Sequence, residues 1–137
     1  INKNMATTRT SQIFFSDLRT DLALNPANDD VLLTTNENAI EQSIKNLLQT
    51  NFYERPFQPD IGSNVRSLLF ELASPHTAYN VKEAIKETIS NFEPRCEILD
   101  VLVESDEDRH SLNVYITFMA VNSENPRTFN LVLDRVR

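Results

Sequence analysis

Apolar residues recur with a helical period in the middle of the chain. In residues 37–49 they stand at i, i+4, i+7 and i+8, which is one stripe of a helix. A second segment follows Ser63, and a third follows Ser74-Pro75, a pair typical of a helix cap and first turn. The three stripes are Ile40, Ile44, Leu47 and Leu48; Val65, Leu68, Leu69 and Leu72; and Ala78, Val81, Ile85, Ile89 and Phe92. The pattern predicts three helices.

The period changes from 3.6 to 2 after residue 96, which is typical of strands with one buried face. The connectors 105–110 and 122–126 are short and polar, so consecutive strands are expected to run antiparallel. The alternating apolar positions are Leu99, Val101 and Val103; Leu112, Val114, Ile116 and Phe118; and Phe129, Leu131 and Leu133. We therefore predict an α+β fold, with about three helices packed on an antiparallel meander of three C-terminal strands.

The first third of the chain lacks a clear period. We predict an extended N-terminal arm over residues 1–34, a brief strand at 31–33 and one domain over residues 35–137. Asn36 is expected to be the N-cap of the first helix. The arm carries exposed-looking apolar residues that this domain or a neighbour must cover: Phe14, Phe15, Leu18, Leu22 and Leu24.

Composition excludes several classes of function. The 137 residues have a net charge of −7, more than half of it from residues 96–137, which argues against nucleic acid as a partner. Gly62 is the single glycine, so phosphate-binding loops and their nucleotide cofactors are not expected. No apolar run or signal-peptide pattern predicts membrane insertion or secretion. Cys96 is expected to be a small core residue.

Acidic residues offer a weak case for glycoside hydrolysis, which needs two facing carboxylates. Candidates exist in Glu54, Asp60, Glu71 and Glu93, but their spacing selects no pair, and tryptophan, the usual sugar platform, is absent from the sequence. Solvated or ion-paired acids are the favoured interpretation, and we expect no catalytic residue.

No metal site is expected either. The acidic run at residues 105–108 resembles half of a calcium loop, but it lacks the glycine turn and the distant glutamate. His76 and His110 have no cysteine or histidine at ligand spacing. A solvated hairpin turn is the favoured interpretation of the acidic run.

Two proline corners carry charges that need partners. One is Glu93-Pro94-Arg95, where the third helix must stop, and the other is Arg55-Pro56-Phe57, in a rigid connector where Gly62 is expected to have a positive φ. Each arginine could pair with its neighbouring glutamate, Glu93 or Glu54, or with a carboxylate across an interface. Both alternatives stay open, and both corners suit docking better than catalysis.

A three-stranded sheet has two open edges, and an open edge can accept a strand from another chain. The C-terminal strand, with Leu131 and Leu133, is the candidate edge.

Three elements in order resemble the baseplate wedge family of contractile-tailed phages. They are Arg55-Pro56-Phe57-x-Pro59-Asp60-x-Gly62, then Leu69-Phe70-Glu71, then Asn91-Phe92-Glu93-Pro94-Arg95, with an early Phe15-Ser16-Asp17-Leu18 in addition. The family is called gene product twenty-five or GPW-like and is similar to TssE of type VI secretion. The resemblance covers roughly residues 13–135.

The resemblance implies a structural protein of the tail baseplate in the virion, assembled in the host cytoplasm. Implied partners are other wedge proteins, the tail sheath protein, and central hub or tube-proximal proteins. Sheath arms would add strands to the sheet and so seed the sheath, and the Glu93-Pro94-Arg95 element would make assembly contacts. Family members have also carried a lysozyme label, so a peptidoglycan hydrolase of the tail is the alternative.

Overall fold

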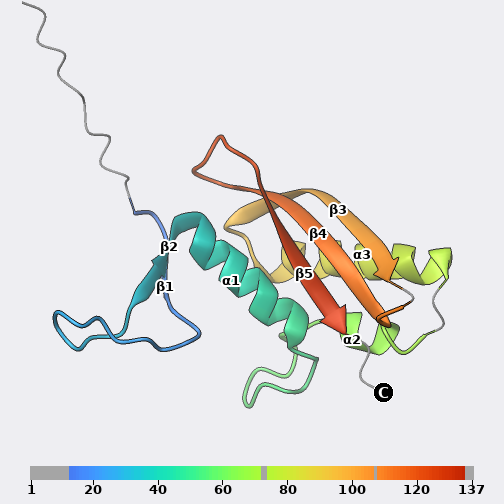
Figure 1. Cartoon of the computed structure of the whole chain (residues 1–137), viewed down its shortest axis with the longest axis horizontal. Coiled ribbons are helices and arrows are strands. Elements are labelled where there is room, and N and C mark those ends of the chain that lie inside the picture. Colours follow the sequence, from blue (N-terminus) through green and yellow to red (C-terminus); the bar gives the residue numbers. More distant parts are fainter. Residues whose placement is uncertain (1–12, 72–73, 107, 135–137) are drawn as a thin grey trace, which may run out of the picture.

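The computed structural model describes residues 13–71, 74–106 and 108–134. Helices lie on one side of a three-stranded sheet, and a small hairpin precedes the first helix (Figure 1). In chain order the elements are β1 (Ser16–Leu18), β2 (Leu33–Thr35), α1 (Asn36–Gln49), α2 (Val65–Leu68), α3 (Pro75–Phe92), β3 (Cys96–Asp106), β4 (Ser111–Ala120) and β5 (Arg127–Asp134). The α+β class and the C-terminal meander are confirmed.

The sheet has the order β3-β4-β5, and both pairings are antiparallel. Leu102 pairs with Tyr115, which pairs with Asn130 on the other side. A bulge between Ile98 and Asp100 shifts the register of β3 near its start. β3 and β5 are therefore the two outer strands of this sheet.

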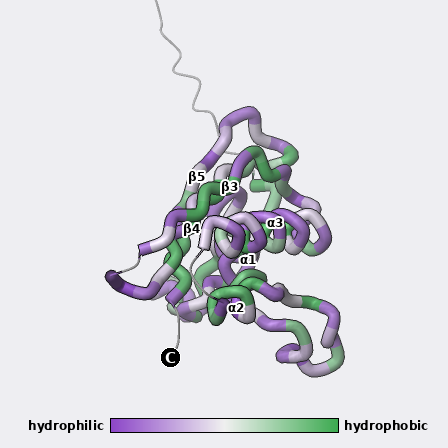
Figure 2. The backbone as a smooth tube through the Cα atoms, turned by 90° about the vertical axis from the view of Figure 1, so that its right-hand side faces the viewer, coloured by the Kyte–Doolittle hydropathy of each residue, from purple (hydrophilic) through white to green (hydrophobic). Residues whose placement is uncertain are grey.

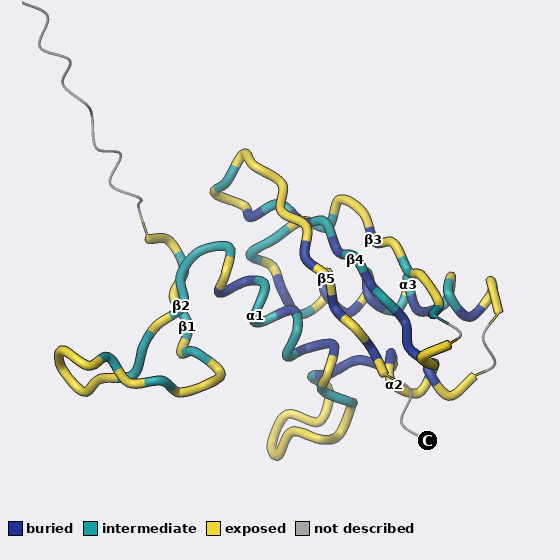
Figure 3. Tube along the Cα trace, viewed as in Figure 1, coloured by how far each residue is buried: buried dark blue, intermediate teal, exposed yellow. Residues whose placement is uncertain are grey.

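The core lies between the helices and the inner face of the sheet. Along β5 buried and exposed residues alternate, as Figure 3 shows, because one face meets the helices and the other meets solvent. Phe118 and Phe129 pack edge to face with ring centroids 5.9 Å apart. Figure 2 shows apolar and polar stretches following one another along the chain. The fully buried apolar residues are Ala39, Ile40, Ile44, Val65, Val81, Ile85, Ile89, Val101, Val114, Ile116 and Phe118.

The helix starts agree with the sequence in one case and differ in another. Ser74 caps α3, since its Oγ accepts the Thr77 N–H at 3.1 Å and Pro75 follows in the first turn. The predicted N-cap at Asn36 is wrong, because the N-cap of α1 is Thr35, which makes no side-chain cap bond. Asn36 Oδ1 instead accepts the N–H of Phe14 at 2.8 Å, so a tertiary contact takes the acceptor that a cap would use.

The N-terminal segment is more ordered than an extended arm. β1 and β2 form an antiparallel pair in which Ser16 faces Thr35 and Leu18 faces Leu33. The brief strand predicted at 31–33 lies at 33–35, and Val31 makes an isolated bridge with Leu24. Residues 1–12 and Leu72 lie outside the described residues. The division into an arm and a domain stays a prediction.

None of the helices in the described ranges is long and apolar enough to cross a membrane.

Candidate functional site: two proline corners and a sheet edge

The first corner joins α3 to β3. The Glu93 N–H still bonds the Ile89 carbonyl at 2.9 Å, and Glu93 then leaves the helical region with φ −126° and ψ 78°. Pro94 cannot continue the helix, and β3 begins two residues later at Cys96. The corner therefore places the side chains of residues 93 and 95 close together.

Those two side chains form a bidentate ion pair. Arg95 Nε donates to Glu93 Oε1 at 2.6 Å, and Arg95 Nη2 donates to Glu93 Oε2 at 2.9 Å. The Glu93 side chain is 2% exposed, so this carboxylate is a buried charge that needs its partner. Within this chain, the Arg95 guanidinium therefore pairs with Glu93.

The same guanidinium also reaches the N-terminal hairpin. Arg95 Nη1 donates to Asp17 Oδ2 on β1 at 3.1 Å, and the Arg95 Cζ lies 5.7 Å from the centroid of the Phe15 ring. The sequence reasoning did not assign Asp17 or Phe15 to this site. The segment Phe15-Ser16-Asp17-Leu18 was noted as part of the family resemblance, but a contact between residues 78 positions apart cannot be predicted from a local sequence pattern.

Electrostatics at this corner follow from burial and pairing. Burial raises the pKa of Glu93, but hydrogen bonds from Arg95 and Ser43 and the Arg95 charge outweigh it, and the pKa lies below its ordinary value. The hydrogen bond to Glu93 raises the pKa of Arg95, so the guanidinium is always charged. Burial, and then the Glu93 charge, raise the pKa of Cys96 to about 12. The raised pKa disfavours the thiolate form, which is the nucleophile, and the half-buried thiol packs against the core as expected.

The second corner lies in the loop between α1 and α2. The loop is closed by the Tyr53 N–H, which bonds the Pro59 carbonyl at 2.9 Å. Tyr53 and Phe57 both have positive φ, 67° and 68°, and both side chains are exposed, Phe57 completely. The loop thus presents two aromatic rings to solvent. Figure 3 shows most of this loop, which follows α1, in the colour of exposed residues.

Gly62 ends this loop, and its φ is positive as predicted, at 159°. The stronger requirement for glycine is space, because a Cβ here would lie 2.7 Å from the Asn51 carbonyl carbon. Ser63 then bonds the Thr50 carbonyl through its N–H at 2.9 Å.

Charges in this loop are arranged differently from those at Glu93. The Glu54 carboxylate accepts the N–H and the side-chain amide of Asn51, at 2.9 and 2.7 Å, and these bonds lower its pKa. Glu54 is thus bonded to Asn51 and not to Arg55, whose side chain is exposed. The structure brings Arg55, Pro56 and Phe57 together on one exposed turn, apart from the buried Glu93 pair.

Leu131 and Leu133 lie on β5 but face the core, with 6% and 7% exposure. What β5 offers a partner is therefore its backbone. The Val121 N–H donates to the Arg95 carbonyl at 3.0 Å, and these two residues lie next to the Cys96–Ala120 pair. Hydrogen-bonded and non-hydrogen-bonded pairs alternate along an antiparallel ladder, so Cys96 and Ala120 form a non-hydrogen-bonded pair.

The direction in which the backbone N–H and carbonyl groups of β5 point follows from this alternation along β4. Inward-facing residues of β4, such as Val114, direct their backbone groups toward β5, and their partners, such as Leu131, bond back. The residues of β5 between those partners direct their N–H and carbonyl groups away from the sheet. Thr128, Asn130 and Val132 are those residues, and all three are exposed.

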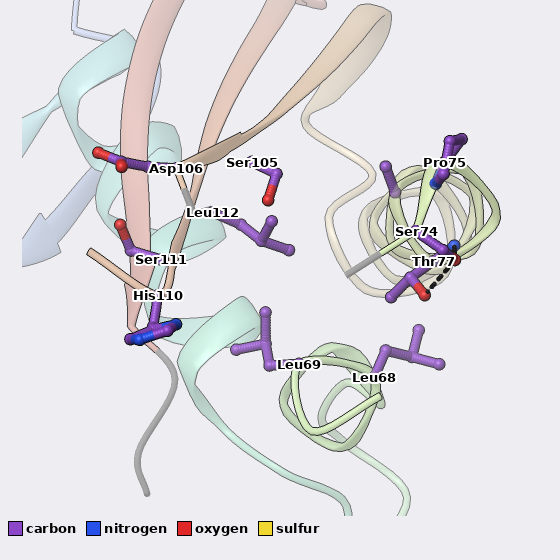
Figure 4. A pocket seen from close by; sticks show the side chains of 11 residues that line it. Leu68, Leu69, Ser74, Pro75, Thr77, Ser105, Asp106, His110, Ser111 and Leu112 are labelled. Carbon is purple, nitrogen blue, oxygen red and sulfur yellow. Dashed lines mark hydrogen bonds between the residues drawn. The ribbon is translucent and has the colours of Figure 1, made fainter. Parts of the chain in front are cut away.

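A cavity of about 540 Å³ opens between α2, the start of α3 and the β3–β4 turn (Figure 4). Leucines and hydroxyl residues line it, together with His110 and Asp106. Asp106 is the single carboxylate among the described lining residues, and a two-carboxylate hydrolysis needs a second one. Across the described ranges, no group of three histidine, cysteine or acidic residues is placed to hold a metal ion.

Comparison with known proteins decides the family. The family model described as baseplate wedge protein gp25 matches residues 34–125. The chain belongs to this family. Baseplate wedge protein gp25 of Enterobacteria phage T4 is 30% identical over 109 residues, which are 80% of this chain and 82% of that protein.

Solved structures share the fold. A crystal structure from Geobacter sulfurreducens, named a candidate tail lysozyme, aligns with a TM-score of 0.71 at 23% identity over 77% of this chain and 96% of that one. A chain of the anti-feeding prophage baseplate aligns at 0.62, with 21% identity and 90% and 87% coverage. A chain of the postcontracted pyocin R2 baseplate aligns at 0.57, with 18% identity and 72% and 96% coverage.

Proposed function

We propose that this wedge-family protein is an assembly module of a contractile tail baseplate. In this role it binds other inner baseplate proteins through its two proline corners and seeds the tail sheath by accepting a strand at β5. The observation that carries the proposal is the outward backbone of Thr128, Asn130 and Val132 on an outer strand. Its N–H and carbonyl groups form the row that an added strand would bond.

The flanks of this edge suit strand addition. The side chains of Asn130 and Val132 stand on the solvent face of the sheet, and so they point away from the plane in which an added strand would bond. The core contacts of Leu131 and Leu133 hold the strand in register, since a one-residue slip would expose both. These two leucines thus support the edge from inside, and direct contact with a partner falls to the backbone.

A pair of proline substitutions tests the proposal. In Asn130→Pro/Val132→Pro, each proline removes an N–H that points away from β4, so the β4–β5 ladder stays intact while the edge loses two donors. The control is Asn130→Thr/Val132→Thr, which changes the same side chains and keeps both N–H groups. We expect baseplates with the proline variant to incorporate the protein but to lack sheath, whereas the threonine variant gives sheathed tails. Sheathed tails from a folded proline variant would overturn strand addition at β5.

The hydrolase alternative rests on one structural relative that is named a candidate tail lysozyme. Its identity of 23% carries the fold and not the chemistry. Purified folded protein should be incubated with peptidoglycan, and release of soluble fragments that disappears in Asp106→Asn would establish this activity at the cavity of Figure 4. We expect no release.

A further inference from the structure

We infer that Arg95 is a positioning residue that fixes the N-terminal hairpin (residues 13–35) against α1. We call the Glu93–Arg95–Asp17 contact the joint. Glu93 is the anchor, the buried partner that holds the Arg95 guanidinium in place, and Asp17 is the partner on the hairpin whose contact can be broken. This inference concerns contacts within one chain, so it stands or falls independently of strand addition and of any partner.

Four elements meet at this joint. Glu93 ends α3, Arg95 precedes β3, Asp17 belongs to β1, and Ser43 of α1 contributes a hydrogen bond that lowers the pKa of Glu93. Arg95 is the group that bonds both the domain, through Glu93, and the hairpin, through Asp17. Its removal would break the link between Glu93 and the hairpin, and within the described part of the chain only the bonds from Asn36 and Gln42 of α1 would then hold the hairpin by side-chain hydrogen bonds.

The anchor makes Arg95 a rigid donor. Two parallel bonds to one carboxylate fix the plane of the guanidinium, and Pro94 restricts the backbone between the paired residues. The remaining Nη1 donor is therefore held at one place, where it meets Asp17. A lysine could not bond both carboxylates in this geometry, because it lacks the planar fork.

An apolar seat and two side-chain amides complete the joint. Phe15 is half-buried, packs against the core and lies under the Arg95 guanidinium. Asn36 Oδ1 accepts the Phe14 and Phe15 N–H groups at 2.8 and 3.4 Å. Gln42 Nε2 donates to the Leu18 carbonyl at 2.6 Å. The hairpin thus lies against α1 over its first two turns.

The hairpin depends on these contacts for its place. Its two strands have three residues each, and an isolated two-stranded hairpin is marginally stable in water. It also presents exposed apolar side chains, namely Leu18, Leu22, Leu24 and Leu33. The joint therefore determines where this apolar surface sits relative to the sheet.

Amide hydrogen exchange of Asp17→Asn tests the inference. The reporters are the four N–H groups that bond across or beside the joint: those of Phe14, Phe15, Thr20 and Asn36. Asp17→Asn removes the charge that Arg95 Nη1 meets, and we expect exchange at these amides to rise about three- to fivefold, as for a half-exposed ion pair. The amides of β4 should keep their exchange rates.

Three comparisons make the result specific. Asp17→Glu keeps the carboxylate and should restore most of the protection. Asp21→Asn removes a carboxylate that bonds Arg19 and Ala23 within the hairpin, so the four reporter amides should not respond. Sodium chloride at about 1 M should raise exchange in the wild type toward the Asp17→Asn level. Unchanged reporter amides in Asp17→Asn, or equal loss of protection in β4, would overturn the inference.

Discussion

At the Glu93–Arg95 corner the two charged side chains bond each other and the Glu93 carboxylate is buried, whereas at Arg55–Phe57 the charged and aromatic side chains are exposed. Both corners contain a proline beside an arginine, and both redirect the chain. The first lies at the end of an 18-residue helix packed on the sheet, so its carboxylate is buried as the helix docks. The second lies in a loop that bonds mainly to itself. Proline sets the backbone, and the packing of the flanking elements decides whether the charges face inward.

The difference between the two corners should be largest in the free energy of unfolding. Arg95→Ala leaves the Glu93 carboxylate buried without its cation, which costs about 3–5 kcal/mol for a buried pair of this kind. Arg55→Ala removes an exposed side chain and should change the free energy of unfolding by about 0.5 kcal/mol or less. Urea unfolding followed by circular dichroism measures both.

Equal losses in these two variants would contradict the comparison. The double change Glu93→Gln/Arg95→Met sharpens it, because it removes both charges together. Since replacing a whole buried pair is often close to neutral, this variant should be more stable than Arg95→Ala.

A second difference is expected in the response to acid. The pKa of Glu93 lies below its ordinary value of 4.5 in the folded protein, so this pair stabilises the fold fully above pH 4.5. The stabilisation is lost as the pH falls through the lowered folded pKa. As the pH is lowered from 5, the free energy of unfolding of the Glu93→Gln variant should therefore fall less than that of the wild type.

The exposed corner provides the control for that measurement. Backbone and side-chain bonds from Asn51 also lower the pKa of Glu54, with the same sign, but this carboxylate is exposed to solvent. Glu54→Gln should keep nearly the whole acid dependence of the wild type. If Glu93→Gln kept it as well, Glu93 would not be the group that couples folding to pH.

Much of this fold could be predicted because its signals are local. The stripe from Val81 to Ile89 and the alternation from Leu112 to Phe118 each report one buried face, and all of these residues are buried. Ser74-Pro75 specified its helix start through short-range bonds. Asn36 failed as a cap because its acceptor serves the N–H groups of Phe14 and Phe15, which no local rule anticipates.

The candidate site was predictable in part for the same reason. Glu93 and Arg95 are two residues apart, so their pairing was one of two alternatives that the sequence allowed. Asp17 and Ser43 come from distant segments, and they meet the pair through packing of β1 and α1. Leu131 and Leu133 were placed on the correct strand, but the backbone groups that point away from the sheet belong to the alternate residues Thr128, Asn130 and Val132.

The smallest stability effect, and a clear functional one, is expected at Phe57. This side chain is completely exposed, so Phe57→Ala should leave the free energy of unfolding within about 0.5 kcal/mol of the wild type. If the second corner is a docking surface, loss of the aromatic ring should still reduce incorporation of the protein into baseplates, as measured by its abundance in purified tails. Tyr79→Ala is the matched control, since Tyr79 is an exposed aromatic residue on α3 and belongs to neither corner. Normal incorporation of Phe57→Ala would contradict docking through this side chain, and the Glu93–Arg95 corner and the β5 edge would remain as the candidate assembly surfaces. Reduced incorporation of Phe57→Ala alone would show that exposure at the second corner serves binding, as burial at the first serves the fold.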